Sequence, residues 1–301
     1  MKMKKQIISM VILLLAVGQG LFAAEFQKPR FYIKFNGIGS LSGGGDFGDF
    51  VDRNETYFTG LSSASDSYTI SFTSPPYFRG YGGEIGIDTN KFAVGISAGY
   101  IEKTFHIDYH YASDTSTFVD NYTRDHTFSA IPIFLFVHYK LIDTRFLTTY
   151  LTIGEGVYLA RYRDDRTETY ENYSLTFSNS YIEGKKNSLG FHIGATIDLN
   201  ISANLALSIE AAYRLTTLKE IAAESYYEDD EQQVDAEGDF YYWINNRTDQ
   251  GRFEIGDPGD RVFWDGLPAK LNLNGFSLSV GIKITFGSRK KPQPVKVAPA
   301  D

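Results

Sequence analysis

The sequence predicts an all-β fold: an eight-stranded antiparallel up-and-down transmembrane β-barrel with long extracellular loops and short periplasmic turns. Three observations predict this class. Eight segments alternate apolar and polar residues with a period of two, a pattern that separates two faces only in a strand. The connections between the segments alternate between short and long. An N-terminal export signal precedes the first segment.

The N-terminus has the basic, apolar, small-residue order of a secretory signal peptide. Lys2, Lys4 and Lys5 precede an apolar run at 7–17, and Ala23 and Ala24 follow it. Ten or so apolar residues are too few for a spanning helix, although a retained anchor is the alternative. We therefore expect residues 1–24 to be removed, 25–287 to form the barrel, and 288–301 to be a basic, proline-rich, disordered periplasmic tail.

The composition narrows the class of protein further. The chain has 21 Tyr, 23 Phe and 28 Gly, and it has no cysteine that could carry a disulfide, a lipid or a thiolate-bound metal. Its net charge is −8. Loss of the three signal-peptide lysines would take that charge to −11, so we expect no nucleic-acid partner.

The last strand has the clearest pattern. Between residues 276 and 286, Phe276, Val280, Ile284 and the other apolar residues alternate strictly with small or polar ones. Eleven residues tilted at about 45° cross the hydrocarbon layer of a bilayer. The pattern and the length together predict a strand that spans a membrane.

Seven upstream segments repeat this pattern. In chain order they are 31–36, 81–88, 92–100, 131–141, 146–161, 189–199 and 205–215. The third is expected to continue outside the membrane through 104–111. The fifth is less regular, because Glu155 shares a parity with apolar residues. A carboxylate facing lipid is costly, so we expect a bulge at 154–156 that turns Glu155 inward.

The connections support an up-and-down order. Three are tight turns, at 89–91, 143–145 and 202–204, and four are long loops, at about 42–79, 112–121, 169–187 and 217–274. Short and long connections in strict alternation are typical of periplasmic turns and extracellular loops. An even number of strands then places both termini in the periplasm.

Alternation alone does not say which face points outward, because a soluble lipocalin-like barrel has the same period. Aromatic residues near strand ends favour a membrane barrel with interfacial girdles. The other face carries small residues and opposite charges, which suit a narrow lumen. The expected lumen charges are Lys34, Glu84, Glu210 and Lys283 at one height, with Arg214 about one layer higher. They predict a buried ion-pair plug, either permanent or able to open as a gate.

On these features the chain resembles the OmpA/OmpX-type family of small outer-membrane barrels. The resemblance covers about residues 29–287 and rests on topology, without a sequence fingerprint. It implies that Phe286, the terminal aromatic of the last strand, is recognised by the barrel-assembly machinery. The tail after this residue departs from the family pattern. No peptidoglycan-binding domain is expected in 15 residues from Gly287.

Two groups of residues could carry chemistry. His106, Asp108 and His110 share one face of a strand extension, and their side chains are suited to binding a transition metal. The alternative is that they form a polar, solvated face without a metal. His126 and Ser129 are three residues apart on a strand and so point to opposite faces, which argues against an acyl-transfer site. We predict no enzyme activity and no cofactor.

The loop at 217–274 has the strongest charge bias, with 14 Asp or Glu against 5 Lys or Arg. The candidate interaction residues combine acids with aromatics; they are Tyr226, Tyr227, Glu228, Asp229, Asp230, Tyr241, Tyr242 and Trp243. This loop could bind a surface ligand or host protein, or it could be a mobile, repulsive surface.

We therefore expect an outer-membrane protein of a Gram-negative-type bacterium that has a structural or surface-interaction role, in membrane integrity, adhesion or recognition. Its other expected partners are outer-membrane lipid and lipopolysaccharide. The first alternative is a narrow pore for small solutes or ions. The second is a lipid-modifying enzyme of the outer membrane.

Overall fold

The computed structural model describes residues 29–42, 44–64, 68–112, 119–171, 177–230, 232–245, 247–248, 250–255 and 264–287. The predicted signal peptide at 1–24 and the predicted tail at 288–301 lie outside these residues. In the part of the chain that is described, no helix is long and apolar enough to cross a membrane.

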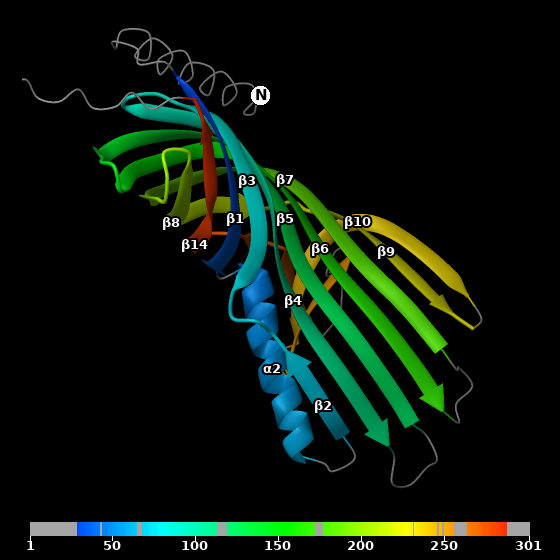
Figure 1. Cartoon of the computed structure of the whole chain (residues 1–301). Coiled ribbons are helices and arrows are strands. Elements are labelled where there is room, and N and C mark those ends of the chain that lie inside the picture. Colours follow the sequence, from blue (N-terminus) through cyan, green and yellow to red (C-terminus); the bar gives the residue numbers. More distant parts are fainter. Residues whose placement is uncertain are drawn as a thin grey trace, which may run out of the picture.

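Eight strands close into an antiparallel ring (Figure 1). In ring order they are β1 (Arg30–Ser42), β3 (Phe78–Asp88), β4 (Phe92–Ala112), β5 (Val119–Asp143), β6 (Leu147–Glu171), β7 (Phe177–Asn200), β8 (Leu205–Leu218) and β14 (Gly275–Phe286). The ring closes because β14 pairs with both β8 and β1, and β7 pairs with β8. These are the eight predicted strands, in the predicted order.

The two faces of the ring differ as the alternation predicts. Val280 and Ile282 are 47% and 52% exposed on the outer face, although both are large and apolar. Lys34, Glu84 and Lys283 are buried on the inner face. The apolar side of the ring therefore faces outward, which is the opposite of a soluble barrel with an apolar centre.

Glu155 corrects one prediction. Pairing runs without a break through this residue, which lies opposite Leu135 on β5 and Phe191 on β7, so there is no bulge and Glu155 is half-buried on the apolar outer face. The register shift in this hairpin lies instead between Lys140 and Ile142. Gly154 serves packing, because a Cβ there would lie 2.4 Å from the ring of Phe136.

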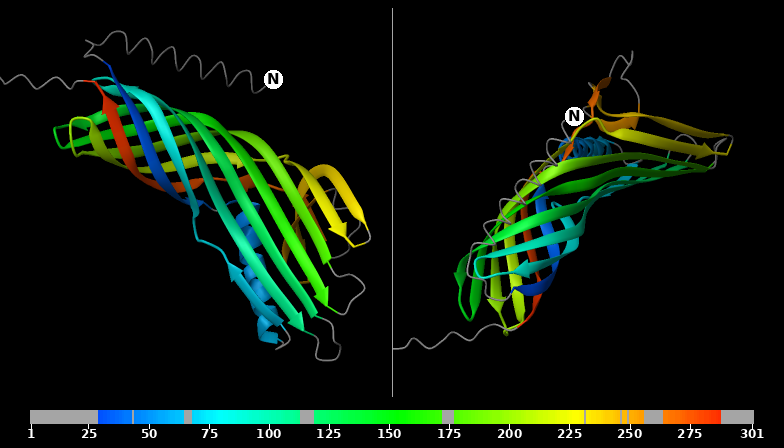
Figure 2. Two further views of the ribbon diagram at one scale, coloured as in Figure 1. Left: turned by 45° about the vertical axis from the view of Figure 1, so that its right-hand side comes forward. Right: turned by 90° about the horizontal axis from the view of Figure 1, so that it is seen from above.

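β4 has 21 residues, which confirms its predicted continuation through 104–111. Three other strands run much further than their alternation indicated, because β5, β6 and β7 have 25, 25 and 24 residues. Figure 2, left, shows them continuing past the ring at the end away from the tight turns, here called the loop end. The predicted loop at 169–187 is largely strand, with only 172–176 outside the described residues. Of the predicted loop at 112–121, residues 112 and 119–121 are strand and 113–118 fall outside the described residues.

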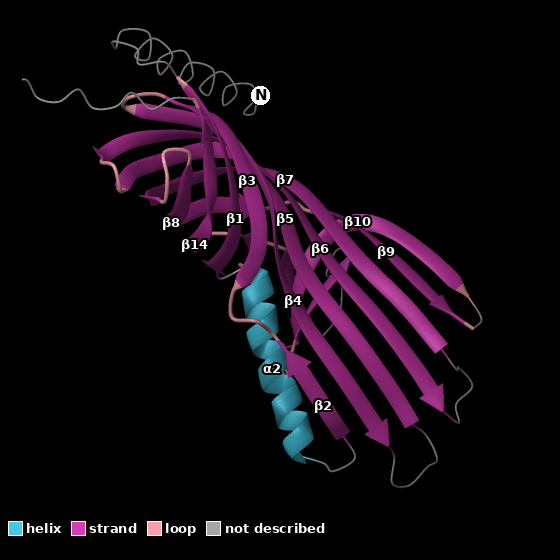
Figure 3. Ribbon diagram, in the orientation of Figure 1, coloured by secondary structure: helices cyan, strands magenta, loops and turns pink. Residues whose placement is uncertain are grey.

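The other two predicted loops form an ordered layer at the loop end (Figure 3). The region at 42–79 contains α2 (Asp46–Ala64) and β2 (Tyr68–Thr73), which pairs with β4. The region at 217–274 contains β9 (Ala222–Asp229), β10 (Gln233–Asn245), β11 (Gly251–Ile255), β12 (Trp264–Pro268) and β13 (Leu271–Asn272). Because β9 pairs with β7, this layer continues the barrel sheet.

An aromatic core holds the layer on the barrel. Phe47, Phe50 and Val51 recur on one face of α2 and are buried. The Phe47 ring lies 5.9 Å from that of Phe128 on β5, and the Phe50 ring lies 5.3 Å from that of Phe253 on β11. Aromatic pairs at such separations add to the stabilisation from burial alone. The helix therefore closes the loop end of the barrel and joins it to the outer sheet.

We predict that Phe50→Ala loosens this layer without opening the ring. The side chain is fully buried, so its loss should cost about 3–5 kcal/mol in the stability of the layer. Limited proteolysis should cut 46–64 faster, while the barrel keeps its different gel mobility before and after boiling. Equal protection of α2 in the variant and the wild type would contradict this account of the core.

Candidate functional site

The lumen is crossed by a chain of buried polar contacts. Lys34 Nζ donates to Glu210 Oε2 at 2.8 Å, and Thr196 Oγ1 donates to the same oxygen at 3.2 Å. The Thr196 and Thr152 hydroxyls are 3.1 Å apart, and Thr152 Oγ1 is 2.9 Å from His138 Nδ1. This chain joins β1, β8, β7, β6 and β5 through the centre of the ring.

The chain ends on β3. His138 Nε2 lies 2.8 Å from Glu84 Oε1, and the Tyr32 hydroxyl donates to the same carboxylate oxygen. Glu84 is also the register partner of Lys34, at which the chain begins. The contacts therefore form a nearly complete polar girdle, defined by Lys34, Glu210, Thr196, Thr152, His138 and Glu84.

A second ion pair lies beside the girdle toward the turn end. Lys283 Nζ donates to Asp198 Oδ2 at 2.8 Å and to the Tyr150 hydroxyl at 3.1 Å. The same ammonium lies 4.6 Å from the centres of the Tyr32 and Tyr150 rings. Arrangements of this kind combine an ion pair with cation–π attraction. They fix Lys283 against strands on the far side of the lumen.

The structure places all five sequence-predicted lumen residues inside the ring, but it pairs them differently. Glu84 contacts His138, and Lys283 contacts Asp198, two partners that were not among the candidates. Arg214 has no carboxylate within ion-pair distance in the described part of the chain. His138 and Asp198 lie on the polar face of their strands, so the alternation pattern could have indicated that they point into the lumen. Their partners could not be predicted, because contacts between non-adjacent strands depend on the cross-section of the ring.

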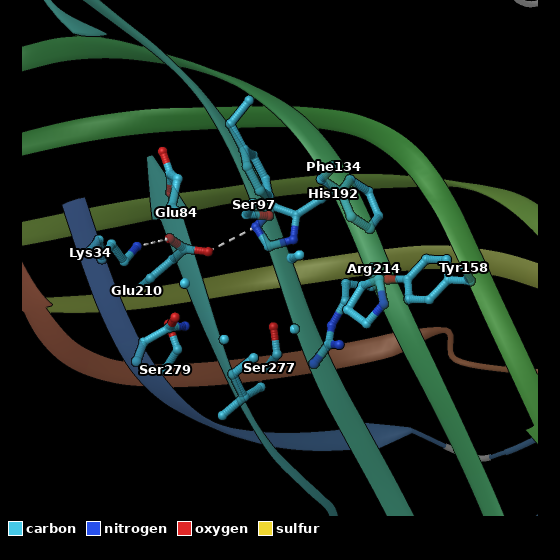
Figure 4. Close-up of a pocket in the computed structure, with 18 residues that line it drawn as sticks. Lys34, Glu84, Ser97, Phe134, Tyr158, His192, Glu210, Arg214, Ser277 and Ser279 are labelled. Carbon is cyan, nitrogen blue, oxygen red and sulfur yellow. Dashed lines mark hydrogen bonds and ion pairs between the residues drawn. The ribbon is translucent and has the colours of Figure 1, made fainter. Parts of the chain in front are cut away.

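Little free space remains in the lumen. A cavity of about 70 Å³ lies between the girdle and the aromatic core (Figure 4). Another, of about 10 Å³, is enclosed by girdle residues together with Tyr32, Asp198 and Lys283. A volume of about 10–15 Å³ holds one water molecule. The polar layer is therefore filled by side chains.

A much larger cavity lies at the loop end, between the extended strands, α2 and β11. Its volume is about 410 Å³. The charged and tyrosine residues that line it are Arg124, Arg166, Arg252, Asp120, Asp164, Glu168, Glu254, Tyr57, Tyr109 and Tyr122. We call this cavity the cleft. None of these residues was among the sequence candidates, because outside the barrel both faces of a strand carry polar residues.

Most charges in the cleft neutralise one another. Arg124 binds both oxygens of Asp164, with Nε donating to Oδ1 at 2.8 Å. Arg166 Nε donates to Glu168 Oε1 at 2.9 Å, and its guanidinium lies 5.0 Å from the centre of the Tyr122 ring. Bidentate and stacked guanidinium groups are held in fixed planes. The cleft is consequently a rigid polar surface with little net charge.

Asp120 is the exception in the cleft. Its Oδ1 atom is buried and finds no hydrogen-bond partner among the described residues. Burial raises the pKa of this carboxyl, and the nearby negative charge of Glu168 raises it further. A buried oxygen that lines a cavity and has no hydrogen-bond donor can accept a hydrogen bond from a ligand.

His126 and Ser129 do not meet. His126 is buried in the aromatic core, 4.2 Å from the Phe50 ring, and its Nδ1 is 2.8 Å from the Tyr162 hydroxyl. Ser129 donates to the Arg161 carbonyl. Burial lowers the pKa of His126 to about 3, although Asp164 nearby opposes the shift. The imidazole is therefore neutral at ordinary pH.

The predicted metal ligands lie on the outer face of β4. His106 contacts Asp108 and Asp125, at 2.9 and 2.6 Å, whereas His110 contacts Asn121. Contact with Asp125, followed by contact with Asp108, raises the pKa of His106. Across the described ranges, no group of three such side chains could hold a metal ion. The structure thus pairs His106 with carboxylates and does not bring the three predicted ligands together.

The predicted interaction loop is a sheet, and two of its residues are misassigned. Tyr242 and Trp243 are buried, and the Tyr242 hydroxyl donates to Asp49 of α2 at 2.8 Å. These two residues anchor the layer and do not form a surface. Tyr226 and Tyr227 stay half-exposed on β9, where their hydroxyls contact Glu228 and Asp229. Asp230 follows at the end of this strand, and Tyr241 is half-buried on β10.

Comparison with known proteins gives distant structural similarities only. No family model and no curated protein sequence matches the chain. A major outer membrane protein of Thermus thermophilus is similar at 13% identity and a TM-score of 0.40, over 86% of this chain and 100% of that one. OprG of Pseudomonas aeruginosa is similar at 9% identity and 0.39, over 87% and 98%.

A third similarity is to the outer membrane protease OmpT of Escherichia coli, at 9% identity and a TM-score of 0.32, over 88% of this chain and 99% of that one. All three are described as outer-membrane proteins, and the OmpA/OmpX-type resemblance inferred from the sequence stays a prediction. The closed ring itself rests on the strand pairing described above.

Removal of one girdle partner should destabilise the barrel more than removal of both. Lys34→Met leaves the Glu210 carboxylate buried without its lysine, which typically costs about 3–5 kcal/mol. The double variant Lys34→Met/Glu210→Met should recover most of that loss. The measurement is the urea midpoint of the refolded barrel, followed by its gel mobility without boiling. Equal midpoints for the single and double variants would show that the pair is not coupled.

Acid should destabilise the loop-end layer through His126. The folded pKa of about 3 lies below the ordinary 6.5, so only the unfolded chain takes up a proton as the pH falls between these values. Stability is then lost on acidification, by up to about 1.4 kcal/mol per pH unit. Protease protection of α2 should fall from pH 6.5 to 4. His126→Asn should flatten this dependence, whereas the exposed control His110→Asn should leave it as in the wild type.

Proposed function

We propose that this chain is an outer-membrane barrel with a sealed lumen, and that it holds a rigid ligand-recognition layer outside the cell. The ring supplies the anchor, and the cleft supplies the binding surface. One observation carries the proposal: the polar girdle fills the lumen and leaves about 10 Å³ within it, while a cavity of about 410 Å³ lies at the loop end.

The outer surface of the ring supports a membrane location. On β6 the outward residues from Leu147 to Leu159 are apolar or uncharged apart from Glu155. Together with outward residues of other strands, such as Ile85, Ile96 and Phe191, they form an exposed apolar band around the ring, here called the belt. Thirteen tilted residues span roughly 25–30 Å, the height of the apolar band of an outer-membrane barrel. An exposed apolar surface of this extent is unfavourable in water.

Basic residues border the belt at the loop end. Arg79, Arg161 and Lys185 point outward there, with 68%, 46% and 60% of their side chains exposed. Lipopolysaccharide phosphates lie at this level of an outer membrane, and charge-assisted contacts with them would fix the loop end on the outside. The termini and tight turns would then be periplasmic. Phe286, half-exposed beside Phe31, remains the proposed signal for the assembly machinery.

The girdle argues against the pore alternative. A conducting path would have to break buried ion pairs between strands that are not neighbours in the ring, and the space inside the polar girdle is about the size of one water molecule. A gate would need the same contacts to open. We therefore favour a structural and recognition role over transport. The separation of His126 from Ser129 likewise favours binding over catalysis.

The chemistry of the cleft favours a carbohydrate ligand, such as the end of a surface polysaccharide. Its arginines are already paired with carboxylates, so a charged ligand gains little net attraction. Fixed guanidinium and carboxylate groups still have unused donors and lone pairs that suit hydroxyl groups. A volume of about 410 Å³ falls within the usual range for small-molecule pockets, roughly 300–1,000 Å³.

The test is binding of the refolded full chain, in detergent, to an array of bacterial and host glycans. Asp120→Ala removes the unmet acceptor from the cleft, while Asp125→Ala removes a carboxylate from the outer face of the same strand. Loss of a hydrogen bond to a charged group should weaken binding roughly tenfold or more in the first variant only. Absence of glycan binding, or equal behaviour of the two variants, would refute the recognition site.

The sealed lumen has a separate test. Purified protein in planar bilayers should give no conductance steps in the wild type. Glu84→Gln breaks a contact of the polar girdle, and Lys283→Met breaks the ion pair beside it. In these two variants any conductance through the lumen should be easier to detect. Regular single-channel steps from the wild type would overturn the sealed-lumen proposal and restore the pore alternative.

A further inference from the structure

Arg214 is a buried cation without a carboxylate partner. Its side chain enters the lumen from β8 and is 4% exposed. Its Nε and Nη2 atoms have no hydrogen-bond partner within the described part of the chain. The Tyr158 hydroxyl is fully buried and unsatisfied in the same way. The two groups are neighbours that interact with each other, and Nε and Nη2 of Arg214 still have unmet donors.

These donors face one cavity. It has a volume of about 70 Å³, and its lining includes Asn36, Ser277, His192 and Phe134 as well as Arg214 and Tyr158. Figure 4 shows the Tyr158 hydroxyl directed at the Arg214 side chain, and Ser277 near the tip of the guanidinium. The aromatic core closes one end of this cavity, and the polar girdle closes the other.

The carboxylates at the cavity floor are committed elsewhere. Glu210 accepts hydrogen bonds from Lys34 and Thr196, and Glu84 accepts them from His138 and Tyr32. Neither comes within ion-pair distance of Arg214. Both carboxylates line the same cavity as Arg214 and Lys34, so they moderate the positive charge of the guanidinium without contacting it.

A buried guanidinium whose donors meet no acceptor is unfavourable, and arginine does not lose its proton in proteins. Water could accept these hydrogen bonds, whereas an anion would accept them and also place a negative charge in direct contact with the guanidinium. We propose that the cavity binds one small monovalent anion, held by Arg214 and by the Tyr158 hydroxyl, as a constitutive part of the folded barrel.

The volume limits which anions fit. About 70 Å³ corresponds to roughly five water-sized positions, so it can hold a halide with residual water or a short carboxylate such as acetate. A lipid chain or a sugar is too large. A halide and a short carboxylate both carry one negative charge, and both accept several hydrogen bonds. This site is independent of the cleft, which lies beyond the aromatic core.

The experiment uses the refolded full chain and bromide, which is visible by anomalous X-ray scattering. A crystal grown in bromide should show an anomalous peak within hydrogen-bond distance of the Arg214 guanidinium. In solution, bromide should replace sulfate at constant ionic strength while urea unfolding is followed. At ten times its Kd, bromide should lower the unfolding equilibrium constant about 11-fold. A parallel acetate series distinguishes a halide site from a carboxylate site.

Arg214→Met removes the cation and keeps a side chain of similar length. It should abolish the response to bromide and acetate, and it should be at least as stable as the wild type when neither anion is present. The control, Lys283→Met, breaks a pair that already has its carboxylate; it should lower stability and keep the anion response. An empty cavity in the crystal, or an equal anion response in wild type and Arg214→Met, would overturn the proposal.

Discussion

The pairing of charges across the lumen is the constraint on which the remaining structure depends. A ring of eight strands with an apolar exterior must place its polar side chains inside, where water cannot solvate them well. The girdle from Lys34 to Glu84 resolves this by linking strands that are not neighbours in the sheet. It therefore fixes the cross-section of the ring and closes the lumen with the same contacts.

The loop end is built on that fixed ring. Because β4–β7 are continuous from the tight turns to their tips, the geometry set by the girdle extends into the layer outside the belt. The aromatic side chains of α2 then fill the mouth, with Phe47 against Phe128 and Phe50 against Phe253. The same sheet therefore forms both the closed lumen and the cleft. The polar interior lies on one side of the aromatic core, and the cleft lies on the other.

The sequence was sufficient to predict the ring but not the layer above it. In 276–286 one face is apolar and exposed and the other lines the lumen, which imposes strict alternation, so length and exposed face can both be predicted. Beyond the belt both faces of a strand meet water or protein, and the pattern around His126 and Arg124 loses its period. The helix at 46–64 was predicted as loop, because its apolar residues are few and Gly48 and Gly60 interrupt them.

The same limit applies to individual contacts. Lys34 and Glu210 could be placed at one height by counting from the turns, but the partner of Glu84 could not. His138 on β5 reaches Glu84 on β3 past the intervening strand β4, and this contact depends on the curvature of the closed sheet. Asp120 carries no local pattern at all. Its importance follows only from the strands and the helix that enclose it.

The length of the extended strands has a consequence for access. From Arg161 to Glu171, β6 continues for eleven residues beyond the belt, a reach of at most about 35 Å at 3.3 Å per residue. In the proposed outer-membrane setting, a cleft held this far from the apolar belt would stand clear of the sugars nearest the lipid. A bulky partner could then dock from the surrounding medium without first entering the glycolipid layer.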